Sequence, residues 1–162
     1  MSVLATRDLP RGIRLHNPGC LERIGIDWHG MAADQSADPH LVVFTGPDWG
    51  IRALARTLLG LQHQEGHRTI ARLIRRFRPP EEHDTIGYCR WVATSLDRAI
   101  DDPVPLDEPA VLMGVVQAVI RREAGPLPAG RSCWYPYETV ARGLKLAHRH
   151  RLTLKPVYLK PV

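Results

Sequence analysis

Glu123 is the side chain best placed for acid–base chemistry, because it ends the most apolar helical pattern of the chain, residues 110–123. Cleavage of a glycosidic bond needs a carboxylic acid that keeps its proton near neutral pH, through burial or an unfavourable local field. The negative end of a helix dipole disfavours a charged carboxylate, whereas Arg121 and Arg122 favour one but project to other faces of the helix. Glu123 is therefore our candidate general acid.

Other chemical signatures are weak. Glu81 and Glu82 form a second acidic cluster, but acidic residues before a helix usually only complement its dipole. The eight histidines make no HExxH pattern and no ligand pair with a cysteine, and neither a GxSxG motif nor a glycine-rich phosphate loop occurs. Cys20, Cys89 and Cys133 are odd in number and form no CxxC pair. We therefore expect no metal, no cofactor and no disulfide framework.

The composition describes a globular chain with a basic surplus. Its 162 residues are 44% hydrophobic and carry a formal net charge of +5. The length fits one domain, and the charge favours a polyanion: nucleic acid, a membrane surface or an acidic polymer such as the bacterial cell wall. A mild surplus can also serve solubility alone. No stretch reaches the roughly 20 apolar residues of a membrane-spanning helix, and the first residues do not form a secretory signal. We expect a soluble protein made in a reducing cytosol.

The elements that must position these groups are helices. Apolar spacing, capping residues and prolines predict helices beginning at Pro47, near Thr69 and after His83 or Asp84, then one at 110–123 capped by Asp107, and one at 136–148.

The first 47 residues are punctuated by proline and glycine, which predicts loops with one strand-like run at 41–44. The predicted fold class is mainly α: a central buried helix, 110–123, surrounded by shorter helices, with at most a small β element in the irregular N-terminal segment. Residues 1–150 are expected to form one domain, and the basic, proline-interrupted residues 151–162 a C-terminal arm.

DNA binding is the third functional interpretation that we considered. Residues 53–60 and 69–76 superficially resemble a helix-turn-helix with arginines on its second helix. The intervening segment 61–68 is too long for the tight turn of that motif, and Pro79 and Pro80 truncate the second helix. A solvated arginine face, made of Arg72, Arg75, Arg76 and Arg78, is the better interpretation.

Several short motifs follow one another along the chain: RGIR at 11–14 with HNPG at 16–19, WHG at 28–30, GIRALA at 50–55, PPEEHDT at 79–85 with Tyr88, and IRREAG at 120–125. Their order resembles a recurring bacteriophage family of virion or structural proteins and lysozyme-like muralytic domains. The resemblance covers roughly residues 9–148. It implies a lysozyme-like fold that acts on peptidoglycan, carried in or on the virion or tail after synthesis in the host cytoplasm.

The same resemblance implies roles for individual residues. Glu123 would be the single acid, protonating the glycosidic oxygen and then acting as base for water or for the sugar's own hydroxyl, as in a lysozyme or a lytic transglycosylase. The candidate substrate-binding residues are His16, Asn17, Trp28, Glu82, Asp84 and Tyr88, with Trp28, Trp49 and Tyr88 available to stack on sugar rings. Arginines would contact the carboxylates of the polymer. Peptidoglycan and other virion proteins are the expected partners; membrane and nucleic acid are not.

The sequence departs from the family pattern at four positions. His16, Cys20, His83 and Ala124 stand where the family's usual motifs have asparagine. Such changes remove side-chain amides of the kind that hold sugar hydroxyls or water. A virion or tail protein that keeps the fold without catalysis is therefore the alternative function.

Overall fold

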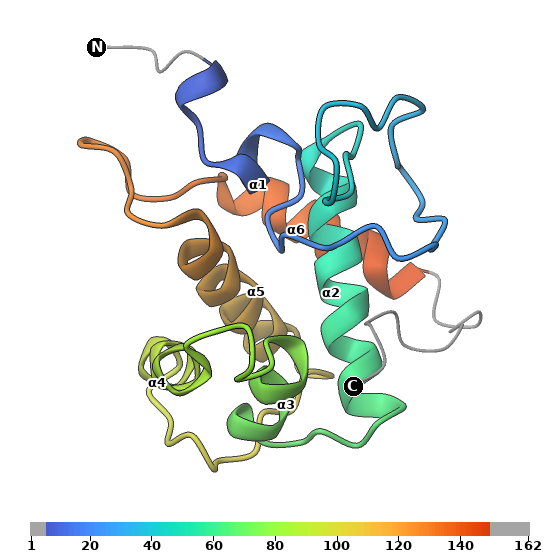
Figure 1. Cartoon of the computed structure of the whole chain (residues 1–162). Coiled ribbons are helices and arrows are strands. Elements are labelled where there is room, and N and C mark those ends of the chain that lie inside the picture. Colours follow the sequence, from blue (N-terminus) through green and yellow to red (C-terminus); the bar gives the residue numbers. More distant parts are fainter. Residues whose placement is uncertain (1–5, 150–162) are drawn as a thin grey trace.

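The computed structural model describes residues 6–149 and is mainly helical (Figure 1). A 3-10 helix at Thr6–Asp8 precedes α1. Within the described residues the α-helices are α1 (Arg11–Arg14), α2 (Pro47–His63), α3 (Ile70–Phe77), α4 (Thr85–Ser95), α5 (Pro109–Ala124) and α6 (Tyr137–Arg149). The predicted fold class is confirmed. The predicted arm, 151–162, lies outside the described residues, as does residue 150.

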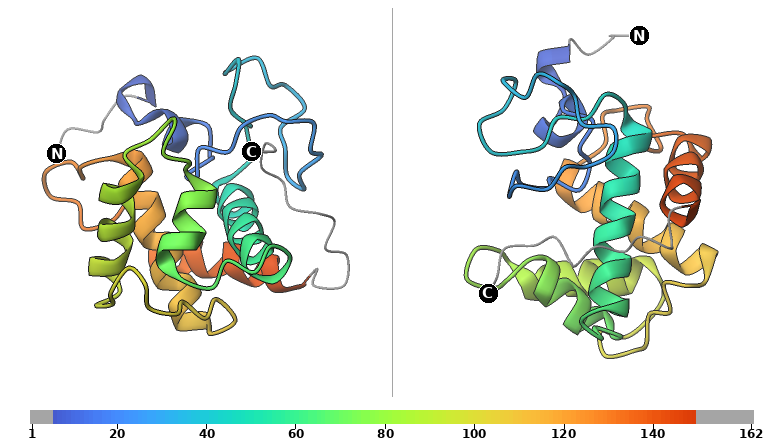
Figure 2. Two further views of the ribbon diagram at one scale, coloured as in Figure 1. Left: turned by 60° about the horizontal axis from the view of Figure 1, so that its bottom comes forward. Right: turned by 90° about the vertical axis from the view of Figure 1, so that its right-hand side faces the viewer.

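Helix α2 is a long buried helix that contacts α3, α5 and α6. The irregular segment 15–46 lies at its N-terminal end, α3 lies at its C-terminal end, and α6 packs along its side (Figures 1 and 2). Helix α4 packs against α3 and α5. The α6 backbone approaches α2 closely at Gly143, where a Cβ atom would overlap the side chain of Ile51. A side chain at that position would therefore push the two helices apart.

Two helices share the centre of the core. The expected burial of the 110–123 helix is confirmed in α5, which contacts α1, α2, α4 and α6. Helix α2 is buried even more completely, because every residue from Gly50 to Gln62 is shielded from solvent. Its apolar positions recur at helical spacing, which is the pattern that predicted this helix.

The predicted helix starts and ends are mostly close to those observed. Thr69 caps α3 by accepting from Arg72 N at 3.3 Å, and Asp84 caps α4 by accepting from Gly87 N at 3.1 Å. The predicted cap of α5 was wrong: Glu108 occupies the N-cap without a side-chain hydrogen bond, and Asp107 pairs with His63 instead. Pro109 opens α5 well without a side-chain cap, because proline fixes a helical φ.

The N-terminal segment contains loops, as expected, but also α1, which its four residues were too few to predict. The strand-like run 41–44 makes only isolated antiparallel bridges, from Leu41 to Glu22 and from Phe44 to Met31. The residues described include no β-strand. The small β element expected in this segment therefore consists of isolated bridges that join its loops.

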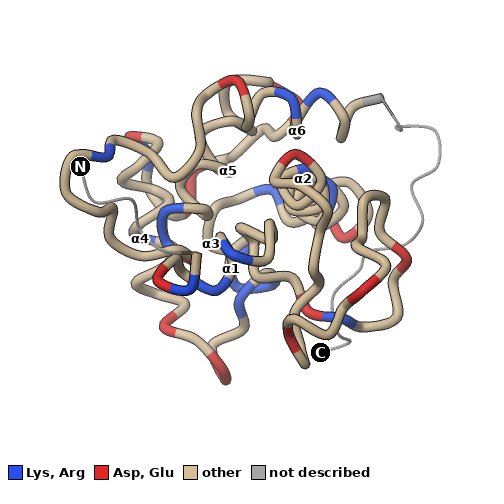
Figure 3. The backbone as a smooth tube through the Cα atoms, turned by 90° about the horizontal axis from the view of Figure 1, so that it is seen from above, with Lys and Arg blue, Asp and Glu red and all other residues tan. Residues whose placement is uncertain are grey.

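Arginines occur on all six described α-helices, and α3 carries three of them. Seen from above, Lys and Arg segments gather around α1 and α3 (Figure 3), in agreement with the basic residues in the last turns of both helices. In the described part of the chain, no helix is long and apolar enough to cross a membrane.

Candidate functional site

Glu123 lies in the last turn of α5, and its side chain is only 14% exposed. Its carboxyl oxygen Oε1 accepts two hydrogen bonds, from Arg78 Nε at 2.9 Å and from Tyr88 Oη at 2.9 Å. The three residues come from the ends or inner faces of α5, α3 and α4. A carboxylate held by two donors from different helices is fixed in position.

Arg78 is the cation of this site, at the C-cap of α3. Its Nη2 donates to the carbonyl of Gly19 at 2.6 Å, and its guanidinium lies over the ring of Phe77, 4.1 Å from the centroid. The prediction that Arg78 belongs to a solvated arginine face was wrong, because the residue is buried. It leaves the exposed face because α3 ends at Phe77 and the chain turns inward.

Cys20 borders the carboxylate from the N-terminal segment. Burial, and then the charge of Glu123, raise the pKa of the Cys20 thiol to about 12. The backbone of Cys20 has φ 47°, a left-handed conformation that favours Gly or Asn. The thiol stays protonated and is therefore not a nucleophile.

Two tyrosines complete the site. Burial raises the pKa of Tyr88 well above its usual value, and the charge of Glu123 adds to this effect, so the hydroxyl remains a donor. Burial also raises the pKa of Tyr135, next to Cys20. Within the described residues, the buried Tyr135 hydroxyl has no hydrogen-bond partner. Such a group is costly unless something else satisfies it.

The two arginines beside Glu123 in sequence project away from it, as expected. Arg121 lies over the ring of Trp91, 5.8 Å from its centroid, and Arg122 lies 5.6 Å from the ring centroid of Tyr88. Arg122 also approaches Asp84 at 3.3 Å, and this pair places Asp84 at the edge of the site.

Some candidate substrate-binding residues have other roles in this structure. Asn17 is fully buried: its Nδ2 donates to the carbonyls of Leu21 and Val42, and its Oδ1 accepts from Leu21 N, each at 2.9 Å. It therefore cannot line a groove and instead fixes the loop that carries Cys20. His16, only partly exposed, has φ 52° at the same turn.

The aromatic candidates are largely covered. Trp28 is 6% exposed and Tyr88 is 5% exposed, so neither ring offers a face to a sugar; both pack in the core. Trp49 is half-buried against the same core. Glu82 is exposed, with His83 4.0 Å away. Of the candidates, the structure brings together Glu123 and Tyr88, with Asp84 at the rim.

Sequence reasoning missed Arg78, Cys20 and Tyr135 as members of the site. Only Cys20 carried a signal, as a departure from the family's asparagine. Arg78 is 45 residues from Glu123 in sequence, and no local pattern reports such a pairing. Among the described residues, no group of three or more His, Cys, Asp or Glu is placed to hold a metal ion.

Comparison with known proteins adds one likeness. No protein-family model matches the chain. Over 143 residues, however, it is 29% identical to Protein P5 of Pseudoalteromonas phage PM2, an alignment that spans 83% of this chain and 80% of that protein. The chain resembles a bacteriophage protein. This likeness, over about four fifths of each protein, supports the phage part of the resemblance expected from the motifs.

Proposed function

We propose that the chain is a virion-associated phage protein that degrades peptidoglycan as a glycosidase, with Glu123 as its general acid and base. The likeness to a phage protein supports the setting. The observation that carries the chemistry is the Glu123 carboxyl group itself: partly buried, at the negative end of an apolar helix, and held at one oxygen by Arg78 and Tyr88.

The mechanism uses the two carboxyl oxygens differently. Arg78 and Tyr88 both donate to Oε1 and neither donates to Oε2. Oε2 is therefore the oxygen that carries a proton to the glycosidic oxygen as the bond to the leaving sugar breaks. The resulting carboxylate then takes a proton from water, or from the hydroxyl of the same sugar as it closes an anhydro ring. Tyr88 keeps the group aligned through both steps.

The test is clearing of purified peptidoglycan in a zymogram by the wild type, Glu123→Gln and Glu108→Gln. Glu108 lies at the opposite end of the same helix, is exposed and makes no side-chain capping bond, so it is the matched control. We expect clearing by the wild type and by Glu108→Gln, and none by Glu123→Gln. Equal clearing by all three proteins would remove Glu123 from the mechanism.

A second candidate function is a virion or tail protein with the same fold and no catalysis. The observation that favours it is the ion pair, because Arg78 Nε lies 2.9 Å from Oε1 and Tyr88 Oη donates to the same oxygen, so that the carboxyl group joins three helices. In that case Glu123 ties α5 to α3 and α4 and does nothing else. Absence of clearing by a folded wild-type protein would select this function.

A further inference from the structure

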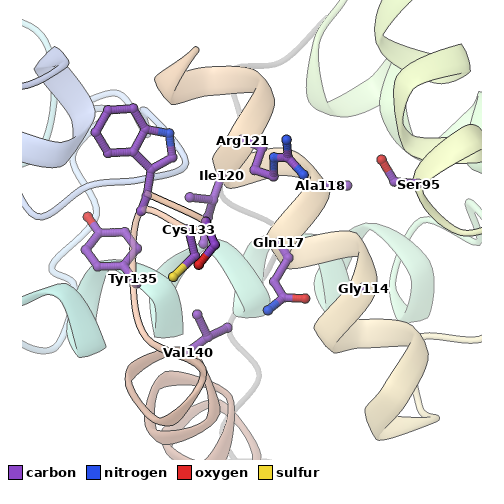
Figure 4. A pocket seen from close by; sticks show the side chains of 11 residues that line it. Ser95, Gly114, Gln117, Ala118, Ile120, Arg121, Cys133, Tyr135 and Val140 are labelled. Atoms are coloured by element: carbon purple, nitrogen blue, oxygen red, sulfur yellow. The ribbon is translucent and has the colours of Figure 1, made fainter. Parts of the chain in front are cut away.

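A pocket of about 250 Å³ lies on another side of α5 (Figure 4). Its floor is a face of α5 made by Gly114, Gln117, Ala118 and Arg121, at helical spacing. Ser95 at the end of α4 lines one side of the pocket, and residues 132–135 line the opposite side. Val140 of α6 forms a further wall. Arg121 and Glu123 are two residues apart, which places them about 200° apart around the helix. The α5 face of the pocket therefore points away from the Glu123 carboxyl group, and Tyr135 borders both sites.

Several polar groups of this pocket have no partner in the described part of the chain. Neither the Gln117 amide nor the Ser132 hydroxyl makes a hydrogen bond, and Arg121 has no ion pair, only the ring of Trp91. No Asp or Glu lines the pocket. Arg121 is solvent-exposed at this pocket, and a guanidinium beside a pocket without acidic residues favours a carboxylate ligand, because charge-assisted bonds are the stronger ones.

The remaining walls are apolar. The ring of Tyr135, the side chains of Ile120 and Val140, and the buried indole of Trp134 line the pocket. Trp134 is held in place because its Nε1 donates to the carbonyl of Gly125 at 3.2 Å. Concave sites with apolar walls and a few convergent polar groups are typical ligand sites. The small volume suits the end of a chain better than a segment running through the pocket.

We propose that this pocket binds the free carboxyl-terminal end of a short peptide with small apolar side chains. The terminal carboxylate pairs with Arg121, the preceding backbone amide pairs with Gln117, and the last side chain packs against Ile120 and Val140. An amide side chain suits a peptide bond because it both donates and accepts. This inference does not rest on the proposed function, since a peptide can bind whether or not Glu123 is catalytic.

Cys133 provides the readout, because it lines the pocket and its side chain is exposed. Cys89 is buried, and burial raises the pKa values of both Cys20 and Cys89, so iodoacetamide applied to the native protein modifies Cys133 first. The rate of alkylation at Cys133, followed by peptide mass spectrometry, is measured with N-acetyl-dialanine, with the C-terminal amide of the same peptide, and with an N-acetylhexosamine disaccharide.

We expect the free-acid peptide to slow alkylation of Cys133, and its amide to need at least about tenfold more ligand for the same protection. Arg121→Gln should raise the half-protecting concentration of the acid by about tenfold, whereas Arg131→Gln, an exposed arginine outside the pocket, should leave it unchanged. Gln117→Leu serves as a second variant should Arg121→Gln lower stability.

Three results would overturn the peptide proposal. Equal protection by the acid and the amide would remove the carboxylate from recognition. Protection by the disaccharide alone would make the pocket a sugar site. Absence of protection by all three probes, with Cys133 still alkylated at its usual rate, would show that the pocket takes none of them.

Discussion

Arg78 and Glu123 form an ion pair whose side chains are 10% and 14% exposed. Each has further partners, since Arg78 also holds the Gly19 carbonyl and Glu123 also accepts from Tyr88. Removing one member of such a pair leaves a charge with little access to water, which costs more than the pair itself contributes. Substitution of one member of this ion pair is therefore the most direct test of how the site is held together.

Arg78→Met should lower the free energy of unfolding by about 3 kcal/mol, because the Glu123 carboxylate loses its counter-ion. Arg76→Met is the control: Arg76 pairs with Glu65 at 2.8 Å, but that pair is more accessible and should contribute no more than about 1 kcal/mol. Urea denaturation measures both. Similar losses in the two variants would show that the Arg78 pair is not special.

Cys20 holds a left-handed backbone conformation where the resembling family has asparagine. Asn tolerates φ near 47° better than Cys, and its side-chain amide can donate hydrogen bonds. Cys20→Asn should therefore raise the free energy of unfolding by up to about 1 kcal/mol. Cys133→Asn, at an exposed position, should leave it unchanged. A loss of stability in Cys20→Asn would mean that packing of the thiol outweighs the backbone effect.

At the scale of elements, the first turn of α2 packs closely against the turn at His16, which precedes Cys20 of the Glu123 site. A Cβ atom on Gly50 would overlap the carbonyl oxygen of His16, which is backbone and cannot move aside alone. Gly50→Ala should therefore cost about 2 kcal/mol or more in thermal or urea unfolding.

Gly114→Ala is the matched control, in the interior of α5. A Cβ there would meet only the methyl end of Leu96, and alanine has the better helix propensity. This variant should lose little stability or gain some. If both alanine variants were equally stable, the close approach at Gly50 would not be a constraint.

Asp38 ties the loop before residues 41–44 to α1. Its carboxylate accepts from Arg11 Nε and Nη2 at 2.5 Å and from the backbone nitrogens of His40 and Leu41, and the bond from Arg11 is the main cause that lowers its pKa. A carboxyl group with a lowered folded-state pKa stabilises the fold above its unfolded pKa, about 4, and this contribution is lost as the pH falls.

Asp38→Asn should therefore lower the melting temperature at pH 7, and the difference from the wild type should shrink as the pH falls below about 4. Differential scanning calorimetry from pH 3 to pH 7 measures it. Asp27→Asn, at an exposed position of the same N-terminal segment, is the control. A difference that stayed constant over this range would mean that Asp38 acts through shape and not through charge.

The sequence predicts α2 to α6 well, because their apolar spacing, prolines and caps are local signals. Thr69, Asp84 and Gly125 mark helix ends where the structure has them. It does not predict the pairing of Arg78 with Glu123 or the full burial of Asn17, because both depend on loops that meet only in the folded chain. A buried amide and a groove-lining amide look the same in sequence.

At the scale of the whole molecule, both the Glu123 site and the pocket are built on α5. One side of its last turn carries the Glu123 carboxyl group, and another side forms the pocket with Arg121 and Gln117. The arginines of α1 and α3 account for part of the +5 charge. Our proposal that peptidoglycan is the partner uses this charge, because a basic surface attracts a polymer that bears carboxylates.

The central claim, that Glu123 cleaves the sugar chain, is tested most directly by the rate at which soluble sugar fragments are released from purified peptidoglycan. The wild type and Glu108→Gln should release fragments at similar rates, and Glu123→Gln should be slower by about 100-fold or more while keeping the circular dichroism spectrum of the wild type. Release at the wild-type rate by folded Glu123→Gln, or no release by any of the three proteins, would contradict it.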